Sequence, residues 1–369
     1  MARNHWHSSR IGLLAGVLLL GLSRAFAQDA VLDAQDQEQP PSRSWTTFGD
    51  LWIGYDHVSG LPGGRANLSR VRGRARLGGI WNFASEWELG GALRVADGSD
   101  ANRDNRRNND NERSDSVGLD QLFVRWRAGE NTSVTAGKTP LAFDLSPMLW
   151  DQDLRPAGVA FDHSIALGEF DRLQLGAAAL AGQNLYGDES RIGVMQAALR
   201  WHEGAPLSGS VLLSYIDFSD IEELTHQGMA RTNSVAAGRY VNDYRLFDLQ
   251  LVGRYKLARC PIEVRLDRVH NLGADVARDG TRGSLTVGDR LQPQGWEFGY
   301  ANQRIQRDAV LAAFNSDEWW FHSATHGQLA WIGYGLDATW NLRLSGFSER
   351  RDGLHRDTDR LRLDLSAHW

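Results

Sequence analysis

Four arginines recur at every second position in one stretch of the chain, at Arg70, Arg72, Arg74 and Arg76. On a β-strand, side chains at i and i+2 lie on the same face, roughly 7 Å apart. A row of guanidiniums could bind anions or pair with carboxylates. It must face water, because each one would cost about 2–4 kcal/mol at the midplane of a lipid bilayer. The spacing therefore predicts a strand with one strongly basic, water-facing side.

Carboxylates that could complement this row lie in the segment 140–156, which contains Asp144, Asp151 and Asp153, with Arg155 nearby. In one interpretation, the row and the segment face each other across water and set up a transverse field, as rows of charge do in selective pores. In the other, the arginines only wet a wall and pair with neighbouring acids. Further arginines have the parity of water-facing positions and extend the candidate lining: Arg125, Arg127, Arg265, Arg343, Arg360 and Arg362.

The last twelve residues, 358–369, show what kind of element positions such side chains. They read TDRLRLDLSAHW, so that apolar residues alternate strictly with Arg360, Arg362, Asp364 and further polar residues. In a soluble protein an unbroken apolar row that ends in Trp369 would make an aggregation-prone edge. The apolar face is no longer exposed to water if it meets lipid, and the edge is no longer open if it pairs with the first strand. The pattern therefore favours a closed transmembrane barrel.

From Trp45 onward, short alternating segments are separated by turn residues, as expected for barrel strands. We predict an all-β fold, a transmembrane antiparallel β-barrel of about sixteen strands that occupies residues 44–369. The expected strands are 45–56, 67–82, 85–97, 117–128, 131–139, 157–166, 171–182, 191–202, 207–218, 243–257, 261–271, 282–290, 295–305, 323–334, 337–348 and 358–369.

The connections between these segments fall into two classes that alternate along the chain. Links such as 129–130 and 258–260 are tight, whereas links such as 98–116 and 219–242 are long. Outer-membrane barrels have short periplasmic turns and longer extracellular loops, whereas a soluble sandwich has no reason to sort its loops by parity. The alternation therefore assigns the long loops to the outside.

The N-terminal residues and the composition fit export. Residues 1–27 read as a signal peptide with basic residues, an apolar run and an Ala25-Phe26-Ala27 cleavage site, and residues 28–43 read as a flexible polar periplasmic lead-in. Without the signal peptide, 37 basic residues stand against 46 acidic ones, a net charge of about −9 that argues against nucleic acid as a partner. The single Cys260 excludes an internal disulfide.

Two stretches carry a resemblance to a known family. These are GKTPLAFDLSPMLWDQDLRPAGVAF from Gly137 and WEFGYANQRIQRDAVLAAFNSD from Trp296. Together with the closing strand, they resemble a porin family of Gram-negative outer-membrane β-barrel proteins that is defined largely by sequence. The resemblance implies passage of small hydrophilic solutes through the outer membrane, and a homotrimer by analogy. Independently of that family, segment 140–156 lies between the fifth and sixth expected strands, where sixteen-stranded trimeric porins fold a loop into the lumen, so we expect it to form a constriction in a barrel that would otherwise be an open channel. We also expect the barrel-assembly machinery to recognise strand 358–369.

Alternative functions remain open. A barrel-scaffold lipase or protease would need a Ser/His/acid set at one rim, and the chain has no G-x-S-x-G or H-E-x-x-H motif. A structural or adhesive barrel would need its lumen plugged by loops. On a strand, His322 and His326 would lie too far apart for a shared metal, so we expect no metal and no cofactor. The arginines in 102–115 could contact lipopolysaccharide phosphates outside the outer-membrane lipid.

Overall fold

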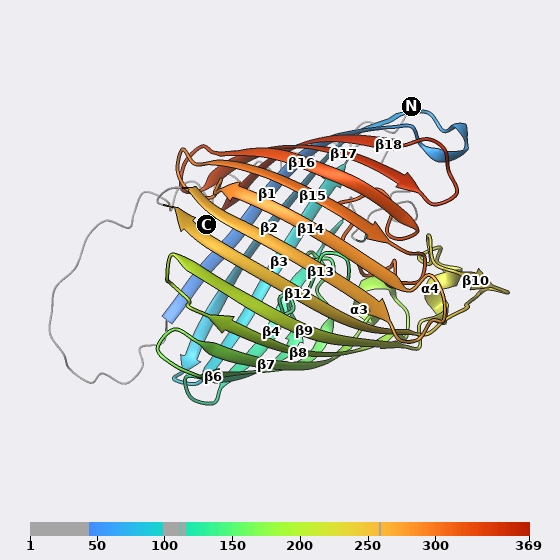
Figure 1. Ribbon diagram of the computed structural model, residues 1–369. Coiled ribbons are helices and arrows are strands. Elements are labelled where there is room, and N and C mark those ends of the chain that lie inside the picture. Colours follow the sequence, from blue (N-terminus) through green and yellow to red (C-terminus); the bar gives the residue numbers. More distant parts are fainter. Residues whose placement is uncertain (1–43, 99–110, 112–115, 258–259) are drawn as a thin grey trace, which may run out of the picture.

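A computed structural model describes residues 44–98, 111, 116–257 and 260–369. Sixteen antiparallel strands form one closed barrel, in which β18 pairs with β1. The predicted fold class and strand number are therefore confirmed, and Figure 1 shows the tilted strands of the wall, with β10 and α4 projecting from one end. The signal peptide and the lead-in predicted for 1–43 lie outside the described residues.

The barrel strands are β1 (Ser44–Ser59), β2 (Leu68–Ala84), β3 (Trp87–Gly98), β4 (Val117–Arg127), β5 (Thr132–Lys138), β6 (Ala157–Ala166), β7 (Arg172–Ala181), β8 (Arg191–Trp201), β9 (Leu207–Ser219), β12 (Tyr244–Leu257), β13 (Cys260–Asn271), β14 (Asp279–Gly288), β15 (Trp296–Ile305), β16 (Thr325–Gly335), β17 (Trp340–Arg351) and β18 (Thr358–His368). The loops contain η1 (Pro62–Gly64), α3 (Gln183–Tyr186), α4 (Glu222–His226) and a hairpin of β10 (Val235–Ala236) and β11 (Arg239–Tyr240).

Closure of the barrel depends on the alternating pattern of the last strand. Leu51 on β1 pairs with Ala367, and Asp56 pairs with Arg362. Leu361 and Leu363 are exposed on the outer wall, whereas Arg360 is buried inside. The period of two in the sequence thus becomes an apolar outside and a charged inside.

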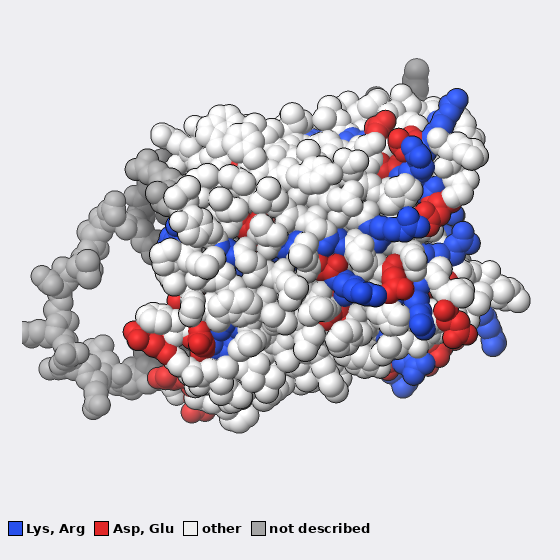
Figure 2. Space-filling model, viewed as in Figure 1, with Lys and Arg blue, Asp and Glu red and all other residues white. Residues whose placement is uncertain are grey.

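The outer wall has the surface of a membrane-spanning barrel. Large apolar side chains such as Ile53, Val71, Phe161 and Leu285 are exposed there. On the face shown in Figure 2, charged side chains gather mainly toward the end from which β10 projects. No helix in the described parts of the chain is long and apolar enough to cross a membrane.

Connection lengths alternate over most of the barrel as the sequence predicted, but the β14–β15 link, residues 289–295, is as long as the β13–β14 link, residues 272–278. Strand boundaries differ by a few residues; β14, for example, begins at Asp279 rather than at residue 282. The hairpin β10–β11 was not predicted, because its strands are only two residues long. A register shift between β3 and β4 leaves Asp120 outside the regular pairing, which interrupts the alternation expected from sequence.

Candidate functional site

The β5–β6 loop, residues 139–156, crosses the inside of the barrel. Arg265 on β13 donates a hydrogen bond to Asp144 Oδ1 at 3.2 Å. At the other end of the loop, Asp153 Oδ2 lies 2.7 Å from Arg74 Nη1, and Asp153 Oδ1 lies 3.1 Å from Arg76 Nη1, both on β2. Six strands separate β2 from β13 around the wall in one direction and eight in the other. The loop therefore contacts nearly opposite sides of the lumen.

The β15–β16 loop, residues 306–324, lies against the β5–β6 loop. The Asp151 amide donates to the Phe314 carbonyl oxygen at 2.7 Å, and the Ser316 amide donates to the Pro147 carbonyl oxygen at 3.0 Å. Arg343 on β17 donates to Glu318 at 2.8 Å. The sequence predicted an external loop here. That expectation was incomplete, because the apolar run Ala309 to Phe314 is fully buried and needs other apolar groups to cover it.

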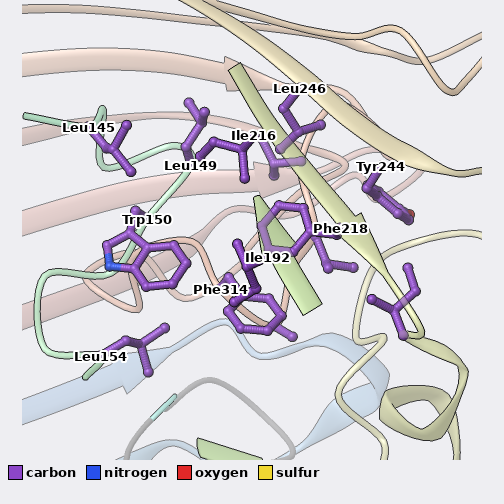
Figure 3. Close-up of a cluster of buried hydrophobic side chains, with 14 of the residues drawn as sticks. Leu145, Leu149, Trp150, Leu154, Ile192, Ile216, Phe218, Tyr244, Leu246 and Phe314 are labelled. Carbon is purple, nitrogen blue, oxygen red and sulfur yellow. The ribbon is translucent and has the colours of Figure 1, made fainter. Parts of the chain in front are cut away.

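An apolar cluster joins the two loops to the wall. The rings of Trp150 and Phe314, one from each loop, are stacked with their centroids 5.7 Å apart, and Phe218 of β9 lies 5.0 Å from Phe314. Figure 3 shows these rings beside Ile192 and Ile216, which point inward from the strands. This packing excludes water from one part of the lumen and fixes both loops.

Other loops complete this internal layer. Asn111 donates from Nδ2 to Asp151 Oδ2 at 2.7 Å and to the Asn315 carbonyl oxygen at 2.6 Å. Asn233, in the β9–β12 connection, donates to the Val310 carbonyl oxygen at 2.8 Å. The β15–β16 loop thus has hydrogen-bonded contacts on several sides, which satisfy backbone groups that are buried away from water.

In the predicted arginine row, Arg70 at one end is sealed from water and the Arg76 side chain at the other end is only 5% exposed, whereas those of Arg72 and Arg74 are 12% and 15% exposed. Arg70 donates from Nε to Asp56 Oδ1 at 2.7 Å, and Arg360 donates from Nη2 to Asp56 Oδ2 at 2.6 Å. The side chains of Arg70 and Arg360 are 0% exposed, and Trp320 lies over Arg70. These two candidates therefore form a buried ion cluster with Asp56 that no solute in the lumen touches.

Arg72, Arg74 and Arg76 continue the row, and each lies near an acid. Arg74 and Arg76 lie 3.7 Å from Asp50 on β1, and Arg72 lies 3.6 Å from Asp56. Arg76 Nε also lies 3.2 Å from Asp120, the residue at the irregularity of β4. Acid and arginine are thus in direct contact along this part of the row.

Arg155 belongs to the cluster of charges around Asp120 and Asp153. Its Nε lies 3.7 Å from Asp120 Oδ2, and its Nη1 donates to backbone carbonyl oxygens of the β5–β6 loop, at Gln152 and Leu154. A cavity of about 440 Å³ adjoins Asp120, Asp153 and Arg155. The cluster therefore borders an open space inside the barrel.

Around the rest of the wall, arginine and acid also alternate. Arg362 on β18 donates to Asp364 Oδ1 at 2.8 Å, and Arg265 and Arg343 bind the loop acids Asp144 and Glu318. These side chains keep part of their surface exposed although they lie inside a closed barrel; Asp153 is the most open at 40%. Their partial exposure means that water-sized space adjoins each of these side chains inside the barrel.

Arg125 and Arg127 occupy a different level of the barrel. Arg125 lies 3.1 Å from Glu88 and Arg127 lies 2.5 Å from it. Both line a cavity of about 730 Å³ at the end with the tight turns, together with residues of the β4–β5 turn. They are therefore separate from the contacts at Asp153.

The pKa values of three carboxyls in the internal loops are shifted by their surroundings. Asp153 is only partly buried, which opposes its ionisation, but Arg74, Arg76 and Arg155 outweigh this effect and hold the pKa of the carboxyl well below its usual range. Burial raises the pKa of Asp151 well above its usual value, and the charges of Asp317 and Asp153 raise it further. Burial also opposes ionisation of Glu318, yet Arg343 and its basic neighbours lower its pKa to about 2.

Solved structures share this architecture. OprB of Pseudomonas putida at high pH is 12% identical, with a TM-score of 0.59 over 88% of this chain and 93% of that one. OmpF of Salmonella typhi in complex with daunomycin is 11% identical, with a TM-score of 0.54 over 89% and 98%. An anion-selective porin from Comamonas acidovorans is 11% identical, with a TM-score of 0.51 over 89% and 100%.

The chain has the porin fold. At these identities the likeness concerns the fold alone, and it agrees with the porin resemblance seen in the sequence. No protein-family profile matches the chain, and no curated protein matches it.

Within the porin fold, the histidines considered as metal ligands have other contacts. His322 is buried beside Arg231 and Asn315, whereas His326 lies 3.6 Å from Asp352. No group of three or more potential metal-ligating residues occurs in the described parts of the chain. The Asp151 carboxyl accepts a hydrogen bond from the backbone amide of Asp153, with a distance of 2.9 Å to Oδ1.

One contact between a serine and a histidine bears on the enzyme alternative. Ser69 Oγ lies 2.8 Å from His57 Nδ1 on the outer side of β1 and β2. A nucleophile-base pair also needs an acid that orients the histidine, and among the described residues no ion pair joins His57 to a carboxylate. The contact alone does not make a catalytic site.

Sequence reasoning missed several residues of the lumen. Asp50 and Asp56 share the inward parity of β1, so their spacing of six residues held a usable signal. Asp120 could not be found this way, because the register shift changes its parity. For Glu318, the signal was the apolar segment before it, which indicated that its loop is buried.

Proposed function

We propose that the protein is an outer-membrane porin through which small hydrophilic solutes and ions diffuse passively. One observation carries this proposal. A closed barrel with an apolar outer wall contains partly exposed charged side chains on its inner wall, at Asp50, Arg74, Arg343 and Arg362. Such a combination is useful only where water fills the interior and lipid surrounds the exterior.

The β5–β6 loop is proposed as the constriction. It contacts both β2 and β13, and its acids Asp144 and Asp153 are anchored by wall arginines. The packed β15–β16 loop narrows the same level further. We therefore infer a restricted channel rather than a wide one, with the arginines Arg72, Arg74, Arg76, Arg362 and their acidic partners as its selectivity element.

The remaining features of the proposal concern the cell. A signal peptide of residues 1–27 would be cleaved on export, and residues 28–43 would lie in the periplasm. Strand 358–369 would be the segment recognised by the assembly machinery, and lipopolysaccharide would surround the loops. A homotrimer is expected, and the mass of the purified protein in detergent by light scattering would test it against a monomer.

The test of the pore is single-channel conductance in a planar bilayer, with a salt gradient to give the reversal potential. We expect discrete steps with anion preference. Replacing both Arg72 and Arg74 with glutamate should shift the reversal potential toward cations, because charges in a narrow aqueous path act with little screening. Arg350→Gln, at an exposed rim position, is the control and should leave it unchanged. An unchanged reversal potential in the double variant would remove this row from the selectivity element.

A second candidate, a barrel plugged for a structural or adhesive role, is favoured by the apolar cluster inside the lumen. The same recording separates the two functions. Correctly folded protein that never conducts would support the plugged barrel, provided that a variant with weaker packing between the two internal loops, such as Phe314→Ala, does not conduct either. We expect no enzymatic activity, since the described residues show no assembled catalytic set.

A further inference from the structure

Trp52 lies on the inner face of β1, between arginines of the two neighbouring strands. Its neighbour Ile53 is exposed on the outer wall, so the alternate residues point inward. In the barrel order, β18 and β2 flank β1. Gly54 of β1 is paired with Arg72 on one side and with Asp364 on the other. Trp52 is thus placed to contact both flanking strands.

Two guanidiniums lie over the Trp52 ring. The distance from the ring centroid to Arg72 Cζ is 5.3 Å, and the distance to Arg362 Cζ is 5.2 Å. Both are within the range of a cation–π contact, in which the ring face attracts the cation. Because the two arginines come from different strands, one side chain sets the position of both.

A shared acceptor fixes the orientation of the ring. Trp52 Nε1 donates to Asp364 Oδ1 at 2.8 Å, and Arg362 Nε donates to the same oxygen at 2.8 Å. Ring and guanidinium therefore cannot rotate independently without losing a charge-assisted hydrogen bond.

Gly54 supplies the space that the ring occupies. A Cβ atom at this position would lie 2.3 Å from Trp52 Cζ2 and 3.0 Å from Asp364 Oδ1. The ring can lie against the wall only because residue 54 has no side chain. Two independent features, Gly54 and Asp364, hold the ring in one place.

We propose that Trp52 is a positioning residue that makes Arg72 and Arg362 a single binding station for small oxyanions, those with a carboxylate or phosphate group. The inference rests on the proposed pore function. A planar guanidinium offers donors along its edge while its face covers an aromatic ring, so an oxyanion approaches the edge. Within the barrel, 12% of the Arg72 side chain and 18% of the Arg362 side chain are exposed, which gives a solute access.

The test compares Trp52→Phe with Trp52→Gln, and inorganic phosphate is the probe. Phenylalanine keeps an aromatic face without the ring N–H, whereas glutamine keeps an N–H donor without the ring. We expect Trp52→Gln to reduce the anion-to-cation permeability ratio by a factor of about 3, and to weaken phosphate block of the chloride current similarly. Trp52→Phe should retain most of both.

Gly54→Ala gives a second line of evidence, since its Cβ would displace the ring without removing it. It should behave like Trp52→Gln, while the rim variant Arg350→Gln should match the wild type. Wild-type selectivity in both Trp52→Gln and Gly54→Ala, with folded barrels and normal conductance, would overturn the inference and leave the pore standing. Equal losses in the phenylalanine and glutamine variants would also overturn it, because the ring face would then have no part. Absence of any wild-type conductance would instead refute the pore and the station together.

Discussion

At the scale of single residues, Asp56 is the charge on which the buried end of the arginine row depends. It accepts from Arg70 and Arg360, and all three side chains are almost completely buried. A buried guanidinium without a counter-charge is strongly destabilising. The cluster therefore stabilises closure of the barrel, because Arg70 lies on β2 and Arg360 on β18, on either side of the seam.

Asp56→Ala should lower the free energy of unfolding by about 3–5 kcal/mol, because it leaves two buried cations uncompensated. Chemical unfolding in detergent micelles, followed by tryptophan fluorescence, would measure the loss. Asp357→Asn removes one partner of the exposed Arg350 pair and should change the midpoint little. Equal effects of the two variants would contradict the assignment of a buried cluster.

The two loop acids Asp151 and Asp153 predict opposite pH dependences. The pKa of Asp153 is lowered in the folded protein, so its contribution to stability is present above the unfolded pKa and is lost only as pH falls through the lower folded value. The pKa of Asp151 is raised, so its contribution is present at acid pH and is lost as pH rises through the folded value.

Asp151→Asn should therefore remove part of the decline in stability as pH rises, and the unfolding midpoint measured across pH would show it. Asp153→Asn should add a loss of stability at neutral pH that disappears at strongly acid pH. A variant profile parallel to that of the wild type at every pH would mean that the altered carboxyl does not titrate differently on folding.

At the scale of elements, the two long internal loops act as one packed unit. Phe314 is fully buried and contacts Trp150, Tyr186 and Phe218. Tyr186 also donates a hydrogen bond to the Ala313 carbonyl oxygen. Core packing, rather than regular secondary structure, therefore holds the loops across the lumen.

Phe314→Ala should destabilise the loop unit by about 3–5 kcal/mol, the usual cost of emptying a buried phenylalanine site. Because the strand ladders remain intact, we expect the barrel to stay folded while single-channel conductance rises and becomes noisier. Protease should also cleave the loops faster. Phe170→Ala, at an exposed position in a tight turn, is the matched control. Unaltered conductance in Phe314→Ala would mean that the loops do not border the ion path.

At the scale of the whole molecule, the two ends of the barrel differ in the length of their connections, which predicts the orientation of the barrel in the membrane. Cys260 is exposed at the start of β13, beside a tight link, whereas Val235 is exposed in the hairpin at the end with the long connections. If the long connections face outward, these two positions lie on opposite sides of the outer membrane.

A membrane-impermeant maleimide should therefore not label native Cys260 on intact cells, but should label it after lysis. In a Cys260→Ser background, Val235→Cys should be labelled on intact cells. Labelling in the reverse pattern would invert the proposed orientation. Labelling of both positions would indicate that the barrel does not separate two compartments.

The sequence by itself determined the barrel and most of the inward charges. Alternation with a period of two decides on which side of a strand each residue lies, so the inward direction of Arg72, Arg74 and Arg362 follows from the sequence alone. The number of alternating segments predicted the strand number, and the alternation of tight turns with long loops indicated an outer-membrane barrel.

Only the tertiary structure decided which charges meet and which remain open to water. Arg70 and Arg74 have the same parity, yet one is sealed under Trp320 and the other borders an aqueous space, because a loop more than 200 positions away covers the first. Asp120 turns inward through a register shift that depends on pairing with β3. Parity is a local property of one strand, whereas burial and charge pairing depend on contacts between segments distant in sequence. For that reason the lining could be predicted from the sequence, but the station at Trp52 and the packed loops could not.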